Sequence, residues 1–227
     1  MRGDPTLPGV DWHTWHRAYD SPDSALVRRL RTVQQRIALD LDERPPGPVR
    51  ALSLCAGQGR DLLGALAGHP RRHDVTARLV ELDPRNVAEA GRRAAALGLT
   101  GIEAVTGDAG LTDRYADAAP ADLVLVCGLF GNITDADIER VTGYCARLCM
   151  SGGTLIWTRN RKRPDRFPWI CRLLEERGFA RVWLNDPDTP QGVGVHRFTG
   201  SPEPLPAGER MFTFVGYDVL DRAREQA

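Results

Sequence analysis

Short apolar runs alternate with helical patterns from residue 49 onward, and this alternation constrains the fold more than any other feature. The first run, VRALSLC (49–55), is largely apolar and bounded by turn residues, as is typical of a parallel strand buried on both faces. Further strands are expected at 75–82, 101–107, 121–128, 152–159, 180–186 and 211–217. Repeated βα units predict an α/β fold with a Rossmann-like, doubly wound, mainly parallel seven-stranded sheet. Because no helix separates the last two runs, we expect a late antiparallel strand.

The segment before this pattern, residues 1–48, is predicted to form an N-terminal tail and a helical lid, an extension to the sheet domain. Apolar residues recur at helical spacing from Asp23 to about Asp42, and Ser21 or Asp23 can cap this helix. A proline-rich linker then leads into a domain that we expect to span residues 49–227.

Composition argues against several classes of protein. The 227 residues include 30 Lys plus Arg and 30 Asp plus Glu, and this neutral balance argues against a dedicated nucleic-acid binder. The sequence has no run of eighteen apolar residues and no basic-then-apolar N-terminus, which argues against a membrane span or a secretory signal. The five cysteines form no CxxC pair, a pattern of reduced buried thiols. We therefore expect a cytoplasmic protein without a metal site, a membrane partner or a nucleic-acid partner.

The segment SLCAGQGRD, residues 53–61, overlaps the end of the first predicted strand and carries Gly57 and Gly59. In an open α/β sheet, ligands bind beyond the carboxyl ends of the strands, and glycine lets the backbone approach a ligand closely. A dinucleotide fingerprint needs a third glycine where this chain has Leu62, and the lysine of a P-loop is absent. The turn is therefore predicted to approach a ligand without a pyrophosphate, and a purely structural turn is the alternative.

Further polar positions lie where the next strands end. Glu81 ends the second strand, where a carboxylate can accept both hydroxyl hydrogens of a ribose. Asp108 ends the third strand, where it can accept from an adenine amine, and Cys127 and Gly128 end the fourth with an open backbone suited to an amino-acid tail. Together these positions predict an adenosine that carries an amino acid. Taken singly, a carboxylate at either position is more often a helix cap or a solvated strand end than a ligand contact.

These turns resemble those of the class I S-adenosylmethionine-dependent methyltransferases, over about residues 49–217. In that family the first motif reads acidic-x-Gly-x-Gly-x-Gly. This chain has Ser53 at the acidic position and Cys55 at the first glycine, whereas Gly57 and Gly59 match. The VELDP and GDA turns match well, and CAGQGRD and CGLFGNI are similar to turns in a group of bacterial methyltransferases without an assigned substrate.

The resemblance implies that residues 49–227 form a class I methyltransferase domain with S-adenosylmethionine as its cofactor. By analogy, Glu81 holds the ribose and Asp108 takes the adenine amine, whereas Asp61 either contacts an ammonium group of the substrate or caps the following helix. The implied cofactor-binding residues are Ala56, Gly57, Gly59, Asp61, Glu81, Leu82, Asp108, Ala109, Cys127 and Gly128, with Leu82 and Ala109 at the adenine and Ala56 to Gly59 at the methionine.

Methyl transfer from a sulfonium is a direct displacement, so the enzyme mainly aligns the nucleophile and excludes water, and a general base is optional. His16 and Tyr19 lie in the stretch WHTWHRAYD, which either reaches over the cofactor as a lid or packs onto the body. Asn132 either orients a substrate or stabilises the turn after the fourth strand. Arg159 begins a basic loop, residues 159–166, that either binds an anionic substrate or is a solvated loop. The candidate catalytic residues are His16, Tyr19, Asn132 and Arg159.

We expect S-adenosylmethionine-dependent methyl transfer to a small-molecule acceptor. The turn after the fourth strand lacks the Asn/Asp-Pro-Pro-aromatic sequence of nucleic-acid amine methyltransferases, which argues against a DNA adenine enzyme. The alternatives are an RNA or protein methyltransferase that uses the basic loop, and a non-catalytic adenosylmethionine-binding protein. The stretch 192–198, with His196, is expected to belong to a long insertion that forms a wall of the substrate site.

Overall fold

The computed structural model describes residues 10–21 and 24–225, and within them seven strands form one sheet in the order β3-β2-β1-β4-β5-β7-β6. The strands are β1 (Val49–Leu54), β2 (Val75–Glu81), β3 (Ile102–Thr106), β4 (Ala121–Val126), β5 (Cys149–Asn160), β6 (Phe179–Leu184) and β7 (Gln191–Phe198). β7 runs antiparallel to both β5 and β6, whereas β1 to β5 pair in parallel. The predicted doubly wound, mainly parallel sheet with a late antiparallel strand is confirmed.

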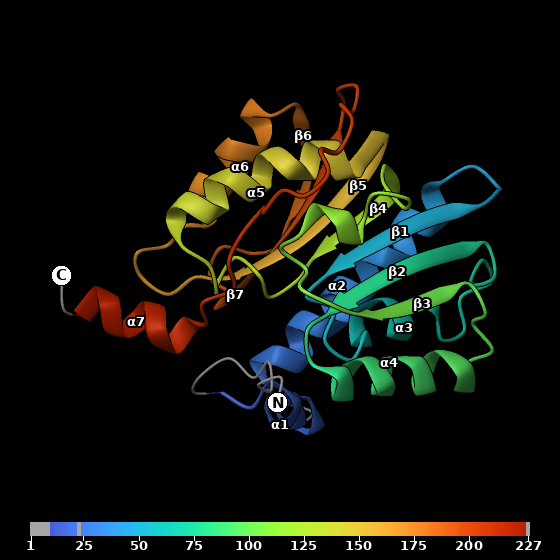
Figure 1. The fold of residues 1–227 in the computed structure, drawn as a ribbon, viewed down its shortest axis with the longest axis horizontal. Helices are drawn as coiled ribbons and strands as arrows, with labels where there is room; N and C mark the ends of the chain where they lie inside the picture. Colours follow the sequence, from blue (N-terminus) through green and yellow to red (C-terminus); the bar gives the residue numbers. More distant parts are fainter. Residues whose placement is uncertain (1–9, 22–23, 226–227) are drawn as a thin grey trace.

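Helices cover both faces of this sheet (Figure 1). They are α1 (Trp12–Trp15), the 3-10 helix η1 (His16–Asp20), α2 (Ala25–Glu43), α3 (Arg60–Leu66), α4 (Pro84–Ala96), the 3-10 helix η2 (Thr112–Arg114), α5 (Asp135–Leu148), α6 (Phe167–Glu176) and α7 (Tyr217–Glu225). α2, α3 and α4 share one hydrophobic core with the sheet, and α5 and α6 share the other. This division leaves the ends of the strands free to form a site.

The identity of the last strand was predicted wrongly. Residues 211–216 form no strand, and the seventh strand is β7, in the stretch assigned to an insertion. Glycines made that stretch resemble a loop, but they serve packing: a Cβ atom at Gly194 would lie 2.6 Å from the Trp157 ring. The backbone of 211–216 instead bonds to loops, with Met211 N donating to Gly110 O. The helix α7 that follows was not predicted.

α2 begins one residue after its cap, and the cap differs from the expected residues. Ser24 accepts a hydrogen bond from Val27 N (3.1 Å), which satisfies one of the free N–H groups of the first turn. Ser21 lies before this turn, and Asp23 lies outside the described residues. At the start of α4, Asp83 caps the helix and Pro84 occupies its first turn.

A buried polar network fastens α2 to the sheet. Asp40 is 4% exposed and accepts from Arg44 Nε (2.7 Å) and from Thr154 Oγ1 (2.5 Å). Arg44 also donates to the carbonyl of Asp122 in β4 (2.6 Å). The carboxyl end of the helix is held by Arg71, which donates to four carbonyl oxygens between residues 41 and 47. These bonds fix the position of α2, and therefore of the side chains that its first turns present.

Candidate active site

A cavity of about 660 Å³ lies at the carboxyl ends of the parallel strands. Its lining comes from the turns after β1, β2, β3, β4 and β5, from α1, η1 and the first turns of α2, and from a segment near the C-terminus. The strand order reverses between β1 and β4, and ligands of open α/β sheets bind at such a switch point. Every candidate residue from the sequence lines this cavity except Gly59: His16, Tyr19, Ala56, Gly57, Asp61, Glu81, Leu82, Asp108, Ala109, Cys127, Gly128, Asn132 and Arg159.

The turn after β1 has a left-handed backbone at alternate residues, with φ of 51° at Cys55, 55° at Gly57 and 64° at Gly59. Within the described residues, Cys55 is the only non-glycine residue with positive φ, so the cysteine adopts the conformation that glycine favours. A Cβ atom at Gly59 would lie 2.7 Å from the Leu79 side chain. Gly59 is therefore needed for packing beneath the turn, whereas Gly57 faces the cavity.

Glu81 ties the turn after β1 to the turn after β2. Its Oε2 accepts from Gly57 N (2.9 Å) and its Oε1 from Asp83 N (3.0 Å). Burial raises the pKa of Glu81, and these hydrogen bonds act in the opposite direction. Because each carboxylate oxygen has two lone pairs, both oxygens retain capacity to accept from a ligand hydroxyl.

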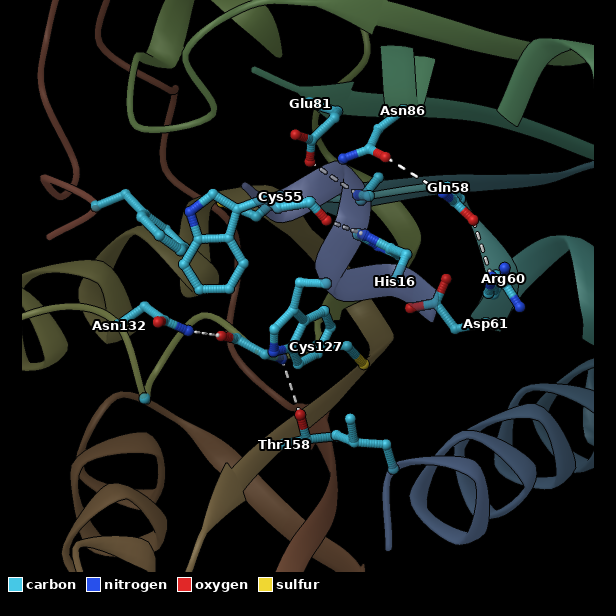
Figure 2. A pocket seen from close by; sticks show the side chains of 18 of the residues that line it. His16, Cys55, Gln58, Arg60, Asp61, Glu81, Asn86, Cys127, Asn132 and Thr158 are labelled. Carbon is cyan, nitrogen blue, oxygen red and sulfur yellow. Dashed lines mark hydrogen bonds between the residues drawn. The ribbon is translucent and has the colours of Figure 1, made fainter. Parts of the chain in front are cut away.

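Asn86 is a site residue that the sequence analysis missed. It is fully buried in the first turn of α4, and its side chain acts to lower the pKa of Glu81. Its Oδ1 accepts from Gln58 Nε2 (3.4 Å), and Figure 2 shows Glu81, Asn86 and Gln58 along one side of the pocket. An asparagine one turn after a cap gives no sequence signal of this contact.

Asp108 lies at the rim, where its two oxygens have different partners. Oδ1 accepts from Gly110 N (2.9 Å) and fixes the turn, whereas Oδ2 pairs with Arg210 (2.8 Å). The side chains of Asp108 and Arg210 are 38% and 46% exposed, so this ion pair contributes little stability and can be exchanged for another donor. Arg210 is distant in sequence and was not predicted. The adjacent Ala109 is held by Tyr115, whose hydroxyl donates to its carbonyl (3.0 Å).

His16 stands in the middle of the pocket (Figure 2). Its Nδ1 lies 2.6 Å from the carbonyl oxygen of Trp12, and because a carbonyl only accepts, Nδ1 carries the proton. Nε2 is then an acceptor, and it faces the glycine turn so closely that a Cβ atom at Gly57 would lie 2.4 Å from it. Burial lowers the pKa of His16, which favours the neutral ring.

A cluster of ionisable side chains lies between the first turns of α2 and α3. Tyr19 Oη accepts from Arg29 Nη2 (2.5 Å), and burial raises the pKa of Tyr19. Asp61 accepts from Leu62 N (2.8 Å), burial raises its pKa, and the Cys127 thiol is beside it. Arg29 also lines the cavity but was not predicted from the sequence, because a lone arginine in a basic helix is typical of a solvated face.

Asn132 and Arg159 secure the turn after β4. Asn132 Nδ2 donates to Gly128 O (2.6 Å), and its Oδ1 accepts from Tyr217 N (2.9 Å), so the side chain joins this turn to α7. Arg159 is 4% exposed and donates to the carbonyl of Phe130. Figure 2 shows Asn132 and Thr158 on the side of the pocket away from Glu81. These contacts show how the two side chains are held and leave their catalytic roles as predictions.

Aromatic side chains from both ends of the chain meet over the cavity. Trp12 packs edge-to-face on Phe214 (ring centroids 5.3 Å apart) and on Tyr217 (5.9 Å). Trp15 packs on Trp12 at 5.8 Å and on Tyr19 at 5.7 Å. We call Trp12, Trp15, Phe214 and Tyr217 the aromatic roof. The stretch WHTWHRAYD predicted the N-terminal half of the aromatic roof. Residues 211–217, which supply the other half, were predicted to form a strand.

Two expectations about neighbouring loops have different outcomes. His196 lies fully buried in β7, where its Nδ1 accepts from Trp157 Nε1 (3.1 Å), and it does not line the cavity; the expected substrate wall at 192–198 is therefore wrong. The basic loop 159–166 does reach the cavity, through Arg159, Asn160 and Lys162. Two of its other cations pair with carboxylates, Arg161 with Asp165 (3.4 Å) and Arg166 with Asp135 (2.6 Å). No helix in the described ranges is long and apolar enough to cross a membrane.

Comparison with known proteins places this geometry in a family. A family model described as "Putative methyltransferase" matches residues 27–185, which include β1 to β6 and most of the cavity lining. No curated protein matches the chain.

Several solved structures share the fold. The carbon methyltransferase CurJ has 16% identity and a TM-score of 0.65, over 84% of this chain and 59% of the CurJ chain. A "possible exported protein" from Bordetella parapertussis has 16% identity and a TM-score of 0.65, over 86% and 80%. An O-methyltransferase family protein from Burkholderia thailandensis has 17% identity and a TM-score of 0.57, over 87% and 70%. At these identities the likeness establishes the fold alone.

Proposed function

The chain belongs to the family described as "Putative methyltransferase", and from this premise we propose that it transfers a methyl group from S-adenosylmethionine to a small-molecule acceptor. The observation that carries the proposal is the hydrogen bond between Glu81 Oε2 and Gly57 N (2.9 Å) at the wall of a 660 Å³ cavity. This bond joins a carboxylate that can accept from ribose hydroxyls to a turn where a Cβ atom at Gly57 would clash with the His16 ring. A cavity of this size matches the volume of typical small-molecule sites, about 300–1,000 Å³.

The residues present fit this cofactor. Glu81 keeps lone pairs for the ribose hydroxyls, and Asp108 can exchange its exposed arginine partner for an adenine amine. Leu82 and Ala109 supply apolar lining for the adenine, and Gly57 lines the cavity at the turn that would contact the methionine part. When bound, S-adenosylmethionine supplies an electrophilic methyl group on a sulfonium.

The chain's own contribution to the reaction is alignment, exclusion of water and, with some acceptors, removal of a proton. The aromatic roof covers the cavity and supplies an apolar surface against which an acceptor can be aligned. Neutral His16, with Nε2 as an acceptor and Nδ1 fixed on the Trp12 carbonyl, has the tautomer that can take a proton from a hydroxyl or amine. Tyr19 and Arg29 are within the same wall and can orient a polar acceptor group.

The ion pairs of the basic loop favour a small-molecule acceptor over RNA. Arg161 pairs with Asp165 (3.4 Å) and packs over the Phe167 ring, and Lys162 pairs with Asp221 (3.7 Å). Cations that already have carboxylate partners offer less charge to a phosphate backbone than a basic face would. We expect the protein not to bind single-stranded RNA at low salt, and this result would support a small-molecule acceptor over RNA.

The test is calorimetric titration with S-adenosylmethionine and S-adenosylhomocysteine, followed by transfer of labelled methyl to a metabolite extract. We expect micromolar binding, about 8 kcal/mol, weakened at least tenfold in Glu81→Ala and in Asp108→Ala. Glu103→Ala, which removes an exposed carboxylate on β3 outside the cavity, is the matched control and should bind normally. Folded native protein that binds neither compound, or that binds them and labels no small molecule, would contradict the proposal.

A further inference from the structure

The two halves of the cavity lining differ in charge. Residues before β4 contribute five carboxylates and three arginines to the lining. From β4 onward, the described part of the chain contributes two cations, Arg159 and Lys162, and no carboxylate. Figure 2 shows Asn132 and Thr158, which belong to this second half, on the side of the pocket away from Glu81. The ribose position at Glu81 therefore lies in an acidic half, and a basic half is left for the acceptor.

Two rings of the aromatic roof are fastened to the basic half. The carbonyl of Asn132 accepts from Val215 N (2.8 Å) and its Oδ1 from Tyr217 N (2.9 Å), so this segment lies against the turn after β4. The rings of Phe214 and Tyr217 line the cavity and are only partly buried, and Trp12 packs edge-to-face on both. Aromatic surface that remains open in a cavity is complementary to another aromatic ring, stacked or edge-to-face.

Lys162 brings a charge to the same half. It is the only lysine in the chain, and its Nζ lies 3.7 Å from Asp221 Oδ2. Because the two side chains are 72% and 40% exposed, this ion pair is weak and a ligand can compete for the ammonium. Asn160 Oδ1 accepts from Lys162 N (3.3 Å), and a Cβ atom at Gly131 would lie 3.3 Å from Asn160 Nδ2. An amide donor therefore lies between the basic loop and the turn after β4.

We propose that the acceptor is a small aromatic carboxylate, with its ring against Phe214 and Tyr217 and its carboxylate on Lys162. The proposal rests on the proposed function, because it names the substrate class of the same site. The buried Arg159 adds positive potential to this half, which disfavours a cationic acceptor. A single ammonium beside an amide donor matches a singly charged carboxylate better than a phosphate dianion.

Three probes of similar size separate the ring from the charge, on full-length protein saturated with S-adenosylhomocysteine. The compound 4-hydroxybenzoate has both features, 4-hydroxybenzamide lacks the charge, and 4-hydroxycyclohexanecarboxylate lacks the aromatic ring. By calorimetry we expect 4-hydroxybenzoate to bind about fivefold more tightly than either analogue, or better, because only it uses both the ammonium and the rings.

Variants assign each preference to its side chain. Lys162→Met should abolish the preference for the benzoate over the benzamide, and Phe214→Leu should reduce the preference for the benzoate over the cyclohexane acid. Arg163→Met, at an exposed position of the same loop and outside the cavity lining, is the matched control for the lysine and should keep both preferences. In all three variants the affinity for S-adenosylhomocysteine should stay within about twofold of the native value, which verifies that the pocket is intact.

The native chain offers a second measurement, because Lys162 is its only lysine. An amine-selective acylating reagent therefore modifies this side chain and the N-terminal amine, and peptide mass spectrometry follows the two separately. We expect 4-hydroxybenzoate to slow the acylation of Lys162 severalfold and to leave the N-terminal amine unaffected. The benzamide should slow neither reaction.

The inference is overturned if 4-hydroxybenzoate binds no more tightly than its analogues, or if Lys162→Met keeps the preference for the charged probe. Acylation of Lys162 at the same rate with and without 4-hydroxybenzoate would also overturn it. Each of these results is obtained on protein that binds S-adenosylhomocysteine, so each leaves the proposed function intact. Native protein that does not bind S-adenosylhomocysteine would instead refute the proposed function.

Discussion

Cys55 occupies a backbone conformation that a side chain makes unfavourable. Its φ of 51° lies in the left-handed region, which costs a non-glycine residue about 1–2 kcal/mol. Comparing Cys55→Gly with Cys55→Ala isolates this cost, because both variants lose the thiol and only alanine keeps a Cβ atom. We expect the glycine variant to be more stable by about 1 kcal/mol in urea unfolding, less than the full strain because glycine also gains freedom in the unfolded chain.

The same pair of changes at Cys127 provides the control. Cys127 also lines the cavity, but its φ is not positive. The Cys127→Ala variant should be more stable than the Cys127→Gly variant by about 0.5–1 kcal/mol, since only the entropy of the unfolded chain distinguishes them. Equal stability of the two Cys55 variants, or a lead for alanine, would show that the turn carries no such strain.

His196 makes stability depend on pH. Burial lowers its pKa from 6.5 to about 4 in the folded protein. Above pH 6.5 the ring is neutral in both states, and below pH 6.5 the unfolded chain binds a proton that the folded protein does not, so stability falls from pH 6.5 towards pH 4. We expect His196→Gln to lose less stability than the native protein between pH 7 and pH 5, by about 2 kcal/mol.

Urea midpoints at the two pH values measure this difference. Val182→Gln, at an exposed position and without a change in titratable groups, is the control and should leave the pH dependence unchanged. Carboxylates with shifted pKa values also contribute to the native curve, but they are common to all three proteins and cancel in the comparison. A His196→Gln variant with the native pH dependence would contradict the assignment of a buried neutral ring.

The sequence predicted the cavity-lining residues of the turns, and His16 and Tyr19 of η1, but it missed other residues that reach the cavity by packing. Glu81 and Asp108 end strands, and the parallel order of the sheet is enough to bring strand ends to one rim. Arg29 and Asn86 reach the same cavity from helices, and Arg210 reaches Asp108 at its rim from a distant loop. Their positions depend on helix packing and chain crossings, which leave no local pattern in the sequence.

At the level of elements, Asp40 supplies a buried polar link between α2 and the sheet, beside the apolar contacts of Val33, Ile37 and Leu41. This carboxylate is 4% exposed and pairs with Arg44 on its own helix and with Thr154 on β5. Removing it takes the closer of two carboxylates from the buried Arg44 guanidinium and leaves the 3.4 Å contact with Asp122, so we expect Asp40→Ala to lower the free energy of unfolding by about 3 kcal/mol. Glu43→Ala, which removes an exposed carboxylate one turn later, should cost less than about 0.5 kcal/mol. Similar losses from both changes, measured in urea, would contradict the assignment.

The elements were predicted best where sequence pattern and tertiary environment agree. β1, β2, β4 and β5 are largely buried strands with mainly apolar sequences, and these four and the edge strand β3 were predicted close to their observed bounds. β7 contains glycines at positions where the rings of Phe167 and Trp157 pack, so its sequence indicates a loop. Residues 211–216 are apolar because they cover the core and the cavity, and that burial resembles a strand pattern. In both cases, contacts with side chains from other elements determine the observed structure.

At the scale of the whole molecule, α1 and the segment before α7, from opposite parts of the sequence, contact each other and both line the cavity. Trp12 in α1 packs edge-to-face on Phe214, about two hundred residues later in the sequence. Such aromatic pairs contribute about 0.5–1.5 kcal/mol beyond the area that they bury. Substitutions of Trp12 and Phe214 should therefore show a coupling energy in the free energy of unfolding.

A double-mutant cycle measures this coupling. We expect Trp12→Ala and Phe214→Ala together to cost about 1 kcal/mol less than the sum of the single changes, because the first change already removes the shared contact. Trp12 combined with Trp183, which packs on Arg36 in another part of the fold, should be additive within about 0.5 kcal/mol. Additivity of Trp12 and Phe214 would mean that the ends do not form one roof. A coupling that increases when S-adenosylhomocysteine is bound would mean that the roof also tightens over the ligand, since only a ligand that favours the closed arrangement can shift the chain towards it.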